Sequence, residues 1–90
     1  MNNILSDNDT KAVHDILVEQ LGVEPAQLTL DARIQEDLCA DSLDVMEIIL
    51  AVEDHFHLSI PDEKAERVST VGDLMEALAD LLGNPERRHA

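Results

Sequence analysis

The sequence is poor in cysteine, in basic side chains and in long apolar runs. A single cysteine among 90 residues excludes an internal disulfide and suits a reducing compartment such as the cytoplasm. Only 6 Lys and Arg stand against 20 Asp and Glu, for a formal net charge of -14. This charge argues against nucleic acid and anionic membranes as partners and favours proteins with basic patches. No run of about eighteen apolar residues occurs, so we expect no membrane insertion.

Ninety residues form one small domain, which buries only ~60–65% of the surface that its unfolded chain exposes. Such a domain has little room for an enclosed active site, so we expect its function to lie on its surface. The chain has neither an internal repeat nor a low-complexity tract. We expect residues 1–6 to form a flexible N-terminus, residues 7–83 the folded domain and residues 84–90 a polar tail.

Apolar residues at helical spacing predict the first and the last helix. After the cap-forming cluster SDNDT, the first helix is expected over residues 8–21, with Gly22 as its stop. The last helix is expected to begin after a cap at Ser69 or Thr70 and to stop at Gly83. Each of these helices should contribute one apolar stripe to a shared core.

Two more helices are expected between these. One begins at residue 41 or 42 and ends near residue 57, and a helix of one or two turns includes Pro61, which a first helical turn tolerates. The connection over residues 22–40 has no clean period, and nothing reads as a pair of strands. The sequence therefore predicts an all-α fold, a small antiparallel four-helix bundle with one short helix and a long loop between its first and second helices.

The second helix has apolar residues on two sides. One stripe fits an arc of about 100°, the width of a core-facing stripe, and consists of Val45, Ile48, Ile49, Val52 and Phe56. On the opposite side lie Leu43, Met46 and Leu50, bordered by Glu47, Glu53 and Asp54. Because a small bundle cannot bury both sides of one helix, we expect the second group to be exposed.

Isolated apolar side chains on a surface are common and need have no function. Here, however, Leu43, Met46 and Leu50 adjoin and are ringed by carboxylates. An apolar centre with a charged rim is typical of a protein docking site, and the flexible Met46 suits several partners. We interpret this side of the helix as a docking surface for proteins with basic patches.

Ser42 stands at the head of this helix in the tripeptide DSL. Serine is among the commonest helix caps, and the tripeptide alone favours that structural role. A catalytic serine needs a base within hydrogen-bond reach, and none of the four histidines is near Ser42 in the sequence. A helix N-terminus favours an attached phosphate by ~0.3–1 kcal/mol, although Asp41 and Asp44 would repel it somewhat. The position therefore also fits a hydroxyl that receives a phosphate group from another protein.

The stretch DLCADSLDVMEIILAVEDHFHLSIPDEKAERVSTVGDLMEAL, from Asp37 to Leu78, resembles the free-standing acyl carrier proteins of bacteria. The resemblance covers nearly half of the chain and depends on DSL, on the acidic and apolar helix after it, and on IPDE and TVGDL. In that family the serine of DSL carries a 4'-phosphopantetheine arm, which a separate phosphopantetheinyl transferase (holo-acyl carrier protein synthase) takes from coenzyme A. Acyl groups are held on the thiol of the arm as thioesters. The resemblance thus implies that Ser42 is the attachment site.

The resemblance also implies a role in fatty-acid, polyketide or related lipid biosynthesis, as a monomeric carrier and not as an enzyme. Enzymes that load and process acyl groups would dock on it through basic patches. The docking residues that the family pattern implies are Asp41, Leu43, Asp44, Met46, Glu47, Leu50, Glu53 and Asp54. An acyl chain is expected to enter the bundle beside Val45 and Ile49.

Three residues depart from the family pattern. Cys39 stands where relatives often have glycine or another small residue, and His55 and His57 replace positions that are often acidic. These differences suggest a carrier dedicated to one pathway. We expect Cys39 to pack as a small apolar group in a reducing compartment.

Other functions fit the sequence less well. An enzyme that used Cys39 with His55 or His57 would need a pocket that a domain of this size hardly offers. The segment DARIQEDLCADS lacks the spaced ligands and central glycine of a calcium-binding EF-hand loop, and the histidines lack metal-ligand spacing, so no metal is expected. An unmodified acidic adaptor, which only docks to partner proteins, remains the alternative function.

Overall fold

The computed structural model describes residues 5–83, so residues 1–4 and the predicted tail at 84–90 lie outside the described residues. The described part contains four α-helices and a short 3₁₀ helix, namely α1 (Asp7–Leu21), η1 (Pro25–Gln27), α2 (Ser42–Phe56), α3 (Asp62–Glu66) and α4 (Val71–Leu82). It has no strand, only an isolated antiparallel bridge between Arg33 and Thr70. The predicted all-α class, with a short third helix and a long loop after the first, is confirmed.

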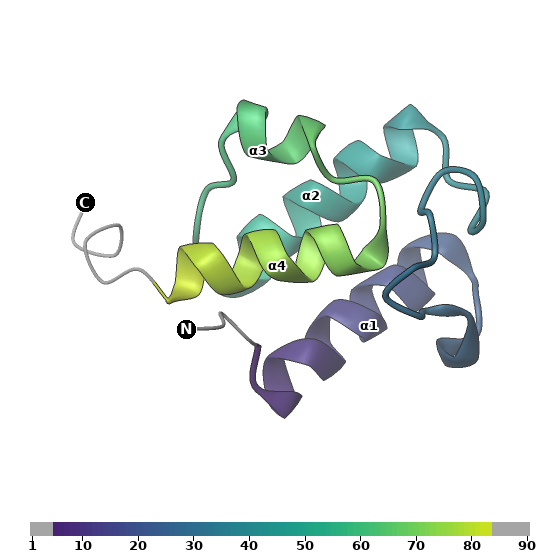
Figure 1. The fold of residues 1–90 in the computed structure, drawn as a ribbon, viewed down its shortest axis with the longest axis horizontal. Coiled ribbons are helices and arrows are strands. Elements are labelled where there is room, and N and C mark those ends of the chain that lie inside the picture. Colours follow the sequence, from purple (N-terminus) through teal and green to yellow (C-terminus); the bar gives the residue numbers. More distant parts are fainter. Residues whose placement is uncertain (1–4, 84–90) are drawn as a thin grey trace.

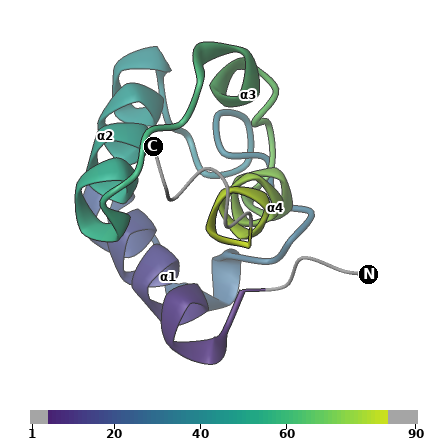
Figure 2. The ribbon, with the colours of Figure 1, turned by 90° about the vertical axis from the view of Figure 1, so that its left-hand side faces the viewer.

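The helices enclose one apolar core. Figure 1 shows α1 running in the opposite direction to α2 and α4, and Figure 2 shows α3 on the side of the bundle away from α1. The most deeply buried side chains are Val13 and Leu17 of α1, Ile48 and Val52 of α2, and Val71, Leu74 and Leu78 of α4. Among residues 5–83 no polar or charged residue is buried, so the fold depends on apolar burial.

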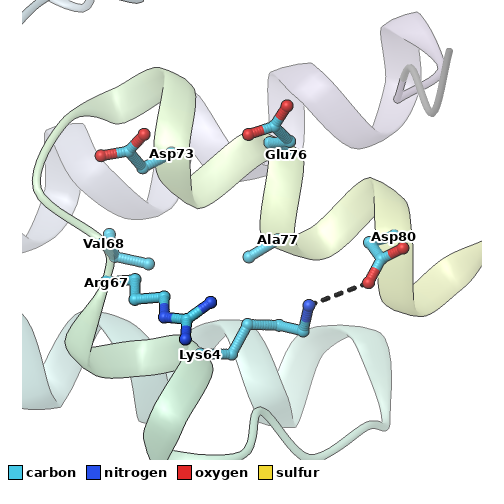
Figure 3. A pocket seen from close by; sticks show the side chains of 7 residues that line it. All are labelled: Lys64, Arg67, Val68, Asp73, Glu76, Ala77 and Asp80. Carbon is cyan, nitrogen blue, oxygen red and sulfur yellow. Dashed lines mark hydrogen bonds and ion pairs between the residues drawn. The ribbon is translucent and has the colours of Figure 1, made fainter.

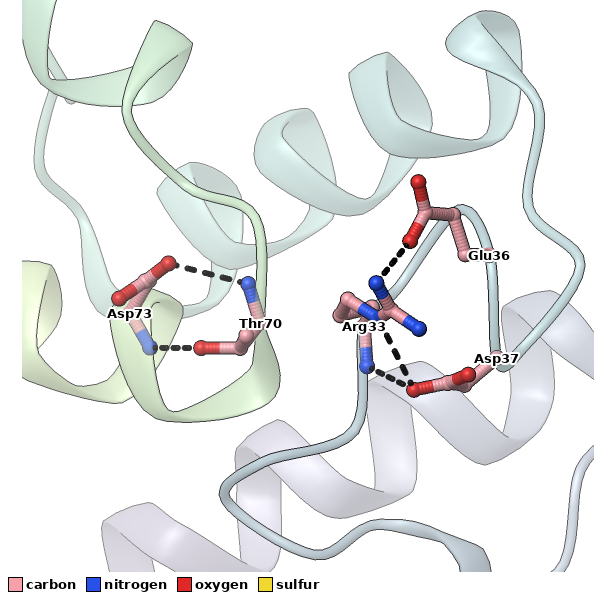
Figure 4. Close-up of polar contacts among 5 residues, drawn as sticks. All are labelled: Arg33, Glu36, Asp37, Thr70 and Asp73. Atoms are coloured by element: carbon pink, nitrogen blue, oxygen red, sulfur yellow. Dashed lines mark hydrogen bonds and ion pairs between the residues drawn. The ribbon is translucent and has the colours of Figure 1, made fainter.

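Capping residues determine where the long helices begin and end. The Ser6 hydroxyl accepts a backbone N–H three residues further on at 3.1 Å and starts α1, and Gly22 ends α1 in the left-handed conformation (φ 68°). At the start of α4, the side chains of Thr70 and Asp73 each accept the other's backbone N–H, which is a capping box (Figure 4). These caps agree with the sequence-based prediction, with Thr70 and not Ser69 as the cap of α4.

The long loop after α1 is ordered although its sequence has no periodicity. Most of its apolar side chains are buried in the core, namely Leu28, Ala32, Ile34, Leu38 and Ala40, whereas Leu30 is exposed. Its backbone is joined to the start of α4, because the N–H of Ile34 donates to the carbonyl of Ser69 and the N–H of Val71 donates to the carbonyl of Ala32, both at 2.9 Å. The helix η1 lies inside this loop and was not predicted. Because of these bonds, the segment that leads into α2 is fixed.

The short helix α3 begins directly after Pro61 and has five residues. A helix of this length is not stable by itself. An ion pair between Lys64 Nζ and Asp80 Oδ2, 2.9 Å apart, joins it to α4 (Figure 3). Its Ala65 packs against the core. The contacts with α4 therefore hold α3 in place beside α2.

Candidate functional site

Ser42 is the first residue of α2, and Asp41 before it is the N-cap. The carboxylate of Asp41 accepts the N–H of Asp44 at 2.8 Å, and the carboxylate of Asp44 accepts the N–H of Asp41 at 3.2 Å. This capping box satisfies two backbone donors without the serine. The view that Ser42 itself caps the helix is therefore wrong, because the residue before it has that role.

The hydroxyl of Ser42 is left available by this arrangement, and the residue is exposed. The N–H groups of Ser42 and Leu43 stand in the first turn of α2, where the helix itself offers them no acceptor. These donors and the helix dipole favour a negatively charged group at the helix start. An exposed hydroxyl in this place is suited to receive a phosphate group.

Arg33 holds the turn that precedes Ser42 (Figure 4). Its backbone N–H donates to Asp37 Oδ2 at 2.9 Å, and its guanidinium lies 2.6 Å from Glu36 Oε1 and 3.5 Å from Asp37 Oδ2. The backbone hydrogen bond from Arg33, followed by its positive charge, lowers the pKa of Asp37 below its ordinary value. Asp37 is therefore ionised at neutral pH and keeps its hydrogen bond and ion pair with Arg33.

Cys39 lies between this turn and Ser42, with its side chain exposed and its φ at 61°. This left-handed conformation costs a residue other than glycine roughly 1–2 kcal/mol, which explains why glycine is favourable at this position. The prediction that Cys39 packs as a small apolar group is wrong, because its side chain lies at the surface. Local sequence gives no sign of the positive φ.

Three large apolar residues cover what we call the outer face of α2. Leu43, Met46 and Leu50 are 62%, 60% and 57% exposed. The stripe on the other side faces the core, with Ile48 and Val52 buried. The two sides of α2 lie where the helical spacing predicts them.

The acids beside the outer face differ in what they contact. Glu47 is exposed and accepts a hydrogen bond from the side-chain amide of Gln20 on α1. Asp54 is also exposed. Glu53, in contrast, is half-buried, and its carboxylate accepts the N–H of Ile60 at 2.7 Å. Glu47 and Asp54 thus present their charge to solvent, whereas Glu53 is engaged with the connection between α2 and α3.

An open groove of about 560 Å³ runs between α2 and α3 beside Ser42. The residues that line it from α2 are Ser42, Val45, Met46, Ile49, Leu50 and Glu53. The opposite wall is lined by Ile60, Asp62, Ala65, Glu66 and Val68, and Gln35 of the long loop also lines the groove. The volume is within the range of small-molecule pockets, ~300–1,000 Å³. The groove is therefore large enough for an apolar group that is tethered to Ser42.

A second cavity, of about 360 Å³, lies between α3 and α4 (Figure 3). Its lining is mostly charged, with Lys64 and Arg67 on one side and Asp73, Glu76 and Asp80 on the other. Ser42 does not line this cavity. The groove beside α2 is therefore the better place for an apolar group.

The described part of the chain has neither a cluster of metal ligands nor a membrane-spanning helix. Within residues 5–83 no three His, Cys, Asp or Glu side chains are placed to hold a metal ion together. None of the helices in this range is long and apolar enough to cross a bilayer.

Several residues of the site were missed at the level of sequence. Gln20 contacts α2 from a position 27 residues away, and nothing in the local sequence signals such a contact. The bond between Glu53 and the backbone of Ile60 also requires the folded connection. The far wall of the groove carried little signal, because Ala65 lies in α3 whereas Val68 lies beyond the end of α3 at Glu66.

The chain is similar to known proteins over most of its length. The family described as phosphopantetheine attachment site matches residues 11–86. An acyl carrier protein of Helicobacter acinonychis (strain Sheeba) is 47% identical over 68 residues, which are 76% of this chain and 87% of that protein. The family match includes all of α2, α3 and α4.

Proposed function

The chain belongs to the acyl carrier proteins, which have a phosphopantetheine attachment site, and from this premise we propose that Ser42 is the attached residue. A protein of this family carries 4'-phosphopantetheine covalently, and this arm supplies a thiol that holds acyl groups as thioesters. The observation that supports Ser42 is its exposed hydroxyl at the first position of α2, while Asp41 caps the helix. A transferase can reach this hydroxyl, and its modification removes no contact that the fold needs.

The start of α2 also suits the phosphodiester that the transferase forms on Ser42. In this step the Ser42 oxygen bonds to the phosphorus that carries the pantetheine, the pyrophosphate bond of coenzyme A breaks, adenosine 3',5'-bisphosphate leaves, and the hydroxyl proton is released. The helix dipole and the N–H groups of the first turn stabilise a negative charge there by ~0.3–1 kcal/mol. Asp41 and Asp44 would repel this charge. Their carboxylates, however, accept backbone N–H groups at 2.8 and 3.2 Å, which reduces the repulsion.

The groove beside Ser42 receives the acyl chain in this proposal. Val45 and Ile49 line it from α2, and Ala65 lines it from α3. Each methylene that the groove removes from water gains about 0.8 kcal/mol. Because the hydroxyl and the groove share one helix, a cargo attached through Ser42 can be sheltered by the same part of the protein.

We assign partner docking to the outer face of α2 and the acids around it. The residues are Asp41, Leu43, Asp44, Met46, Glu47, Leu50, Glu53 and Asp54. The apolar side chains would provide the packed centre of an interface, and the carboxylates would steer partners with basic patches. These partners are the phosphopantetheinyl transferase and the enzymes that load and process acyl groups. The formal net charge of -14 supports such steering.

Intact-protein mass spectrometry tests the carrier function. Incubation with a broad-specificity phosphopantetheinyl transferase, coenzyme A and magnesium should add one 4'-phosphopantetheine to the wild-type chain and none to Ser42→Ala. The modified chain should then accept an acyl group that hydroxylamine removes. If several active transferases leave the wild type unmodified, the assignment of Ser42 fails and the unmodified acidic adaptor is the better function.

Association and dissociation rates with the transferase test the docking face. Met46→Ala and Leu50→Ala should raise the dissociation rate about fivefold or more, because they remove apolar anchors from the centre of the interface. Glu47→Lys and Asp54→Lys should slow association by roughly two- to tenfold and weaken its dependence on salt, because steering by opposite charge is lost.

Two matched controls separate docking from general surface effects. Leu30→Ala removes a leucine that is 62% exposed but lies outside α2, and Glu19→Lys reverses an exposed acid on α1. Both should leave the rates almost unchanged. Equal effects of the controls and the α2 variants would show that the partner docks elsewhere.

His55, His57 and Cys39 are the residues that depart from the family pattern, and all three are exposed. His55 and His57 are exposed near the end of α2 and make this end less negative than the family pattern, which supports a carrier dedicated to one pathway of fatty-acid, polyketide or related lipid biosynthesis. The thiol of Cys39, the single one in the chain, is exposed and suits the reducing cytoplasm. We further propose that the chain works as a monomer with partner enzymes and catalyses no reaction itself.

A further inference from the structure

Glu53 organises the whole connection between α2 and α3. Its carbonyl accepts the N–H groups of His57 and Leu58, and His57 ends the helix in the left-handed conformation (φ 57°). Its carboxylate accepts the N–H of Ile60 at 2.7 Å. The side chain of Ile60 is only 5% exposed and belongs to the core. The connection is thus held by its backbone and by an apolar anchor.

This connection lies at the end of the groove that is distant from Ser42. Ser42 and Glu53 both line the groove, and they are separated along α2 by about 16 Å, at ~1.5 Å for each helical residue. Ile60 lines the groove as well. The bond between the Glu53 carboxylate and the Ile60 N–H therefore joins the two walls of the groove at its far end.

We propose that Glu53 determines how long an acyl chain the groove can hold, because its bond to Ile60 closes the far end. The inference rests on the proposed acyl-carrying function of the groove. A chain that ends before Glu53 is covered along its whole length. A longer chain must either part Glu53 from the Ile60 N–H or lie against the Glu53 carboxylate, and both are unfavourable because a polar acceptor loses a hydrogen bond or its water.

Glu53 is thus a positioning residue, which acts on the chain through the connection and through Ile60. Glu53 differs from Glu47 and Asp54 in that it is half-buried and bonded to a backbone N–H, whereas Glu47 and Asp54 are exposed. A carboxylate that only steers partners has no need of a bond to a backbone N–H. The role in the groove therefore accounts for an observation that docking leaves unexplained.

The test compares holo-proteins that carry straight acyl chains from butyryl to palmitoyl. Two properties are measured for the wild type, Glu53→Ala and Glu53→Gln. The first is the rate at which hydroxylamine cleaves the thioester, relative to its rate with the same free acyl-pantetheine. The second is the rate of amide hydrogen exchange at Ile60. Glu19→Ala is the control, because it removes the same charge from an exposed position on α1 that does not line the groove.

In Glu53→Ala, the Ile60 amide should exchange about tenfold faster or more, because a charge-assisted hydrogen bond is lost. The longest protected acyl chain should become longer, and each further methylene that the groove covers should slow cleavage by up to about fourfold. Glu53→Gln should restore the wild-type pattern, since its amide oxygen accepts the same N–H. Glu19→Ala should match the wild type.

Other outcomes overturn the proposal. It fails if Ile60 exchange rises in Glu53→Ala while the length limit stays the same, if Ile60 exchange does not change, or if no variant protects any chain. In that last case an arm on Ser42, seen by its mass, leaves the assignment of Ser42 as the attachment site standing, whereas a wild type without an arm overturns both. Should Glu53→Ala fail to fold, Glu53→Asp takes its place, because it keeps the charge but is one methylene too short to reach Ile60.

Discussion

Ile48 and Leu50 are two residues apart on α2, yet Ile48 is 1% exposed and Leu50 is 57% exposed. The two side chains have the same composition, and they differ in what surrounds them. Ile48 belongs to the core cluster with α1 and α4, whereas Leu50 lies on the outer face and beside the groove. One helix can thus stabilise the core with one side and leave its other side exposed for the proposed docking, because the helical period separates neighbouring residues.

The largest expected effect is the difference in stability between Ile48→Ala and Leu50→Ala. Ile48→Ala should lower the free energy of unfolding by about 2–5 kcal/mol, because it leaves a cavity in the core. That is a large share of the ~5–15 kcal/mol of a typical domain. Leu50→Ala should change it by no more than about 0.5 kcal/mol. Urea unfolding followed by circular dichroism measures both, and equal losses would show that the outer side of α2 is also part of the core.

A similar contrast exists at the start of α2, where Asp41 caps the helix and Ser42 does not. Asp41→Ala should lower the free energy of unfolding by about 1 kcal/mol, since it removes the N-cap. Ser42→Ala should stay within about 0.5 kcal/mol of the wild type, because the serine makes no cap. Thermal and urea unfolding of the two unmodified variants provide the measurement. A loss in Ser42→Ala as large as that in Asp41→Ala would contradict the assignment of the cap.

The smallest effect concerns Cys39, whose side chain is exposed although its backbone is in the left-handed region. Cys39→Gly should raise the free energy of unfolding by about 0.5 kcal/mol, because relief of ~1–2 kcal/mol is partly offset by the greater freedom of glycine in the unfolded chain. Cys39→Ala should show no gain. Urea unfolding under reducing conditions compares them, and equal values for the glycine and alanine variants would exclude strain at this position.

Much of the fold could be predicted because it depends on local sequence. Gly22, Thr70 and Gly83 mark helix ends through caps that involve neighbouring residues only, and apolar spacing identifies the faces of each helix. The order of the long loop could not be predicted. It comes from hydrogen bonds such as that from Ile34 to Ser69, which join residues far apart in the chain.

The candidate site divides in the same way. The exposure of Leu43, Met46 and Leu50 on the outer face could be predicted from helical geometry, because a small bundle cannot bury both sides of one helix. The cap could not be assigned, because aspartate and serine are both good N-caps and the box with Asp44 decides between them. The role of Glu53 could not be seen either, since a carboxylate on a helix carries no sign that it will meet a backbone N–H beyond the helix end.

We propose that the Ser42 hydroxyl, which the Asp41 cap leaves free, receives the arm. Peptide mapping by tandem mass spectrometry after treatment with transferase and coenzyme A tests this claim most directly, because the chain also contains Ser6, Ser59 and Ser69. We expect the whole mass increment of one 4'-phosphopantetheine on Ser42 and none on the other three serines. An increment on any of those three, or a wild-type chain that stays unmodified while the transferase modifies a control carrier, would contradict the account.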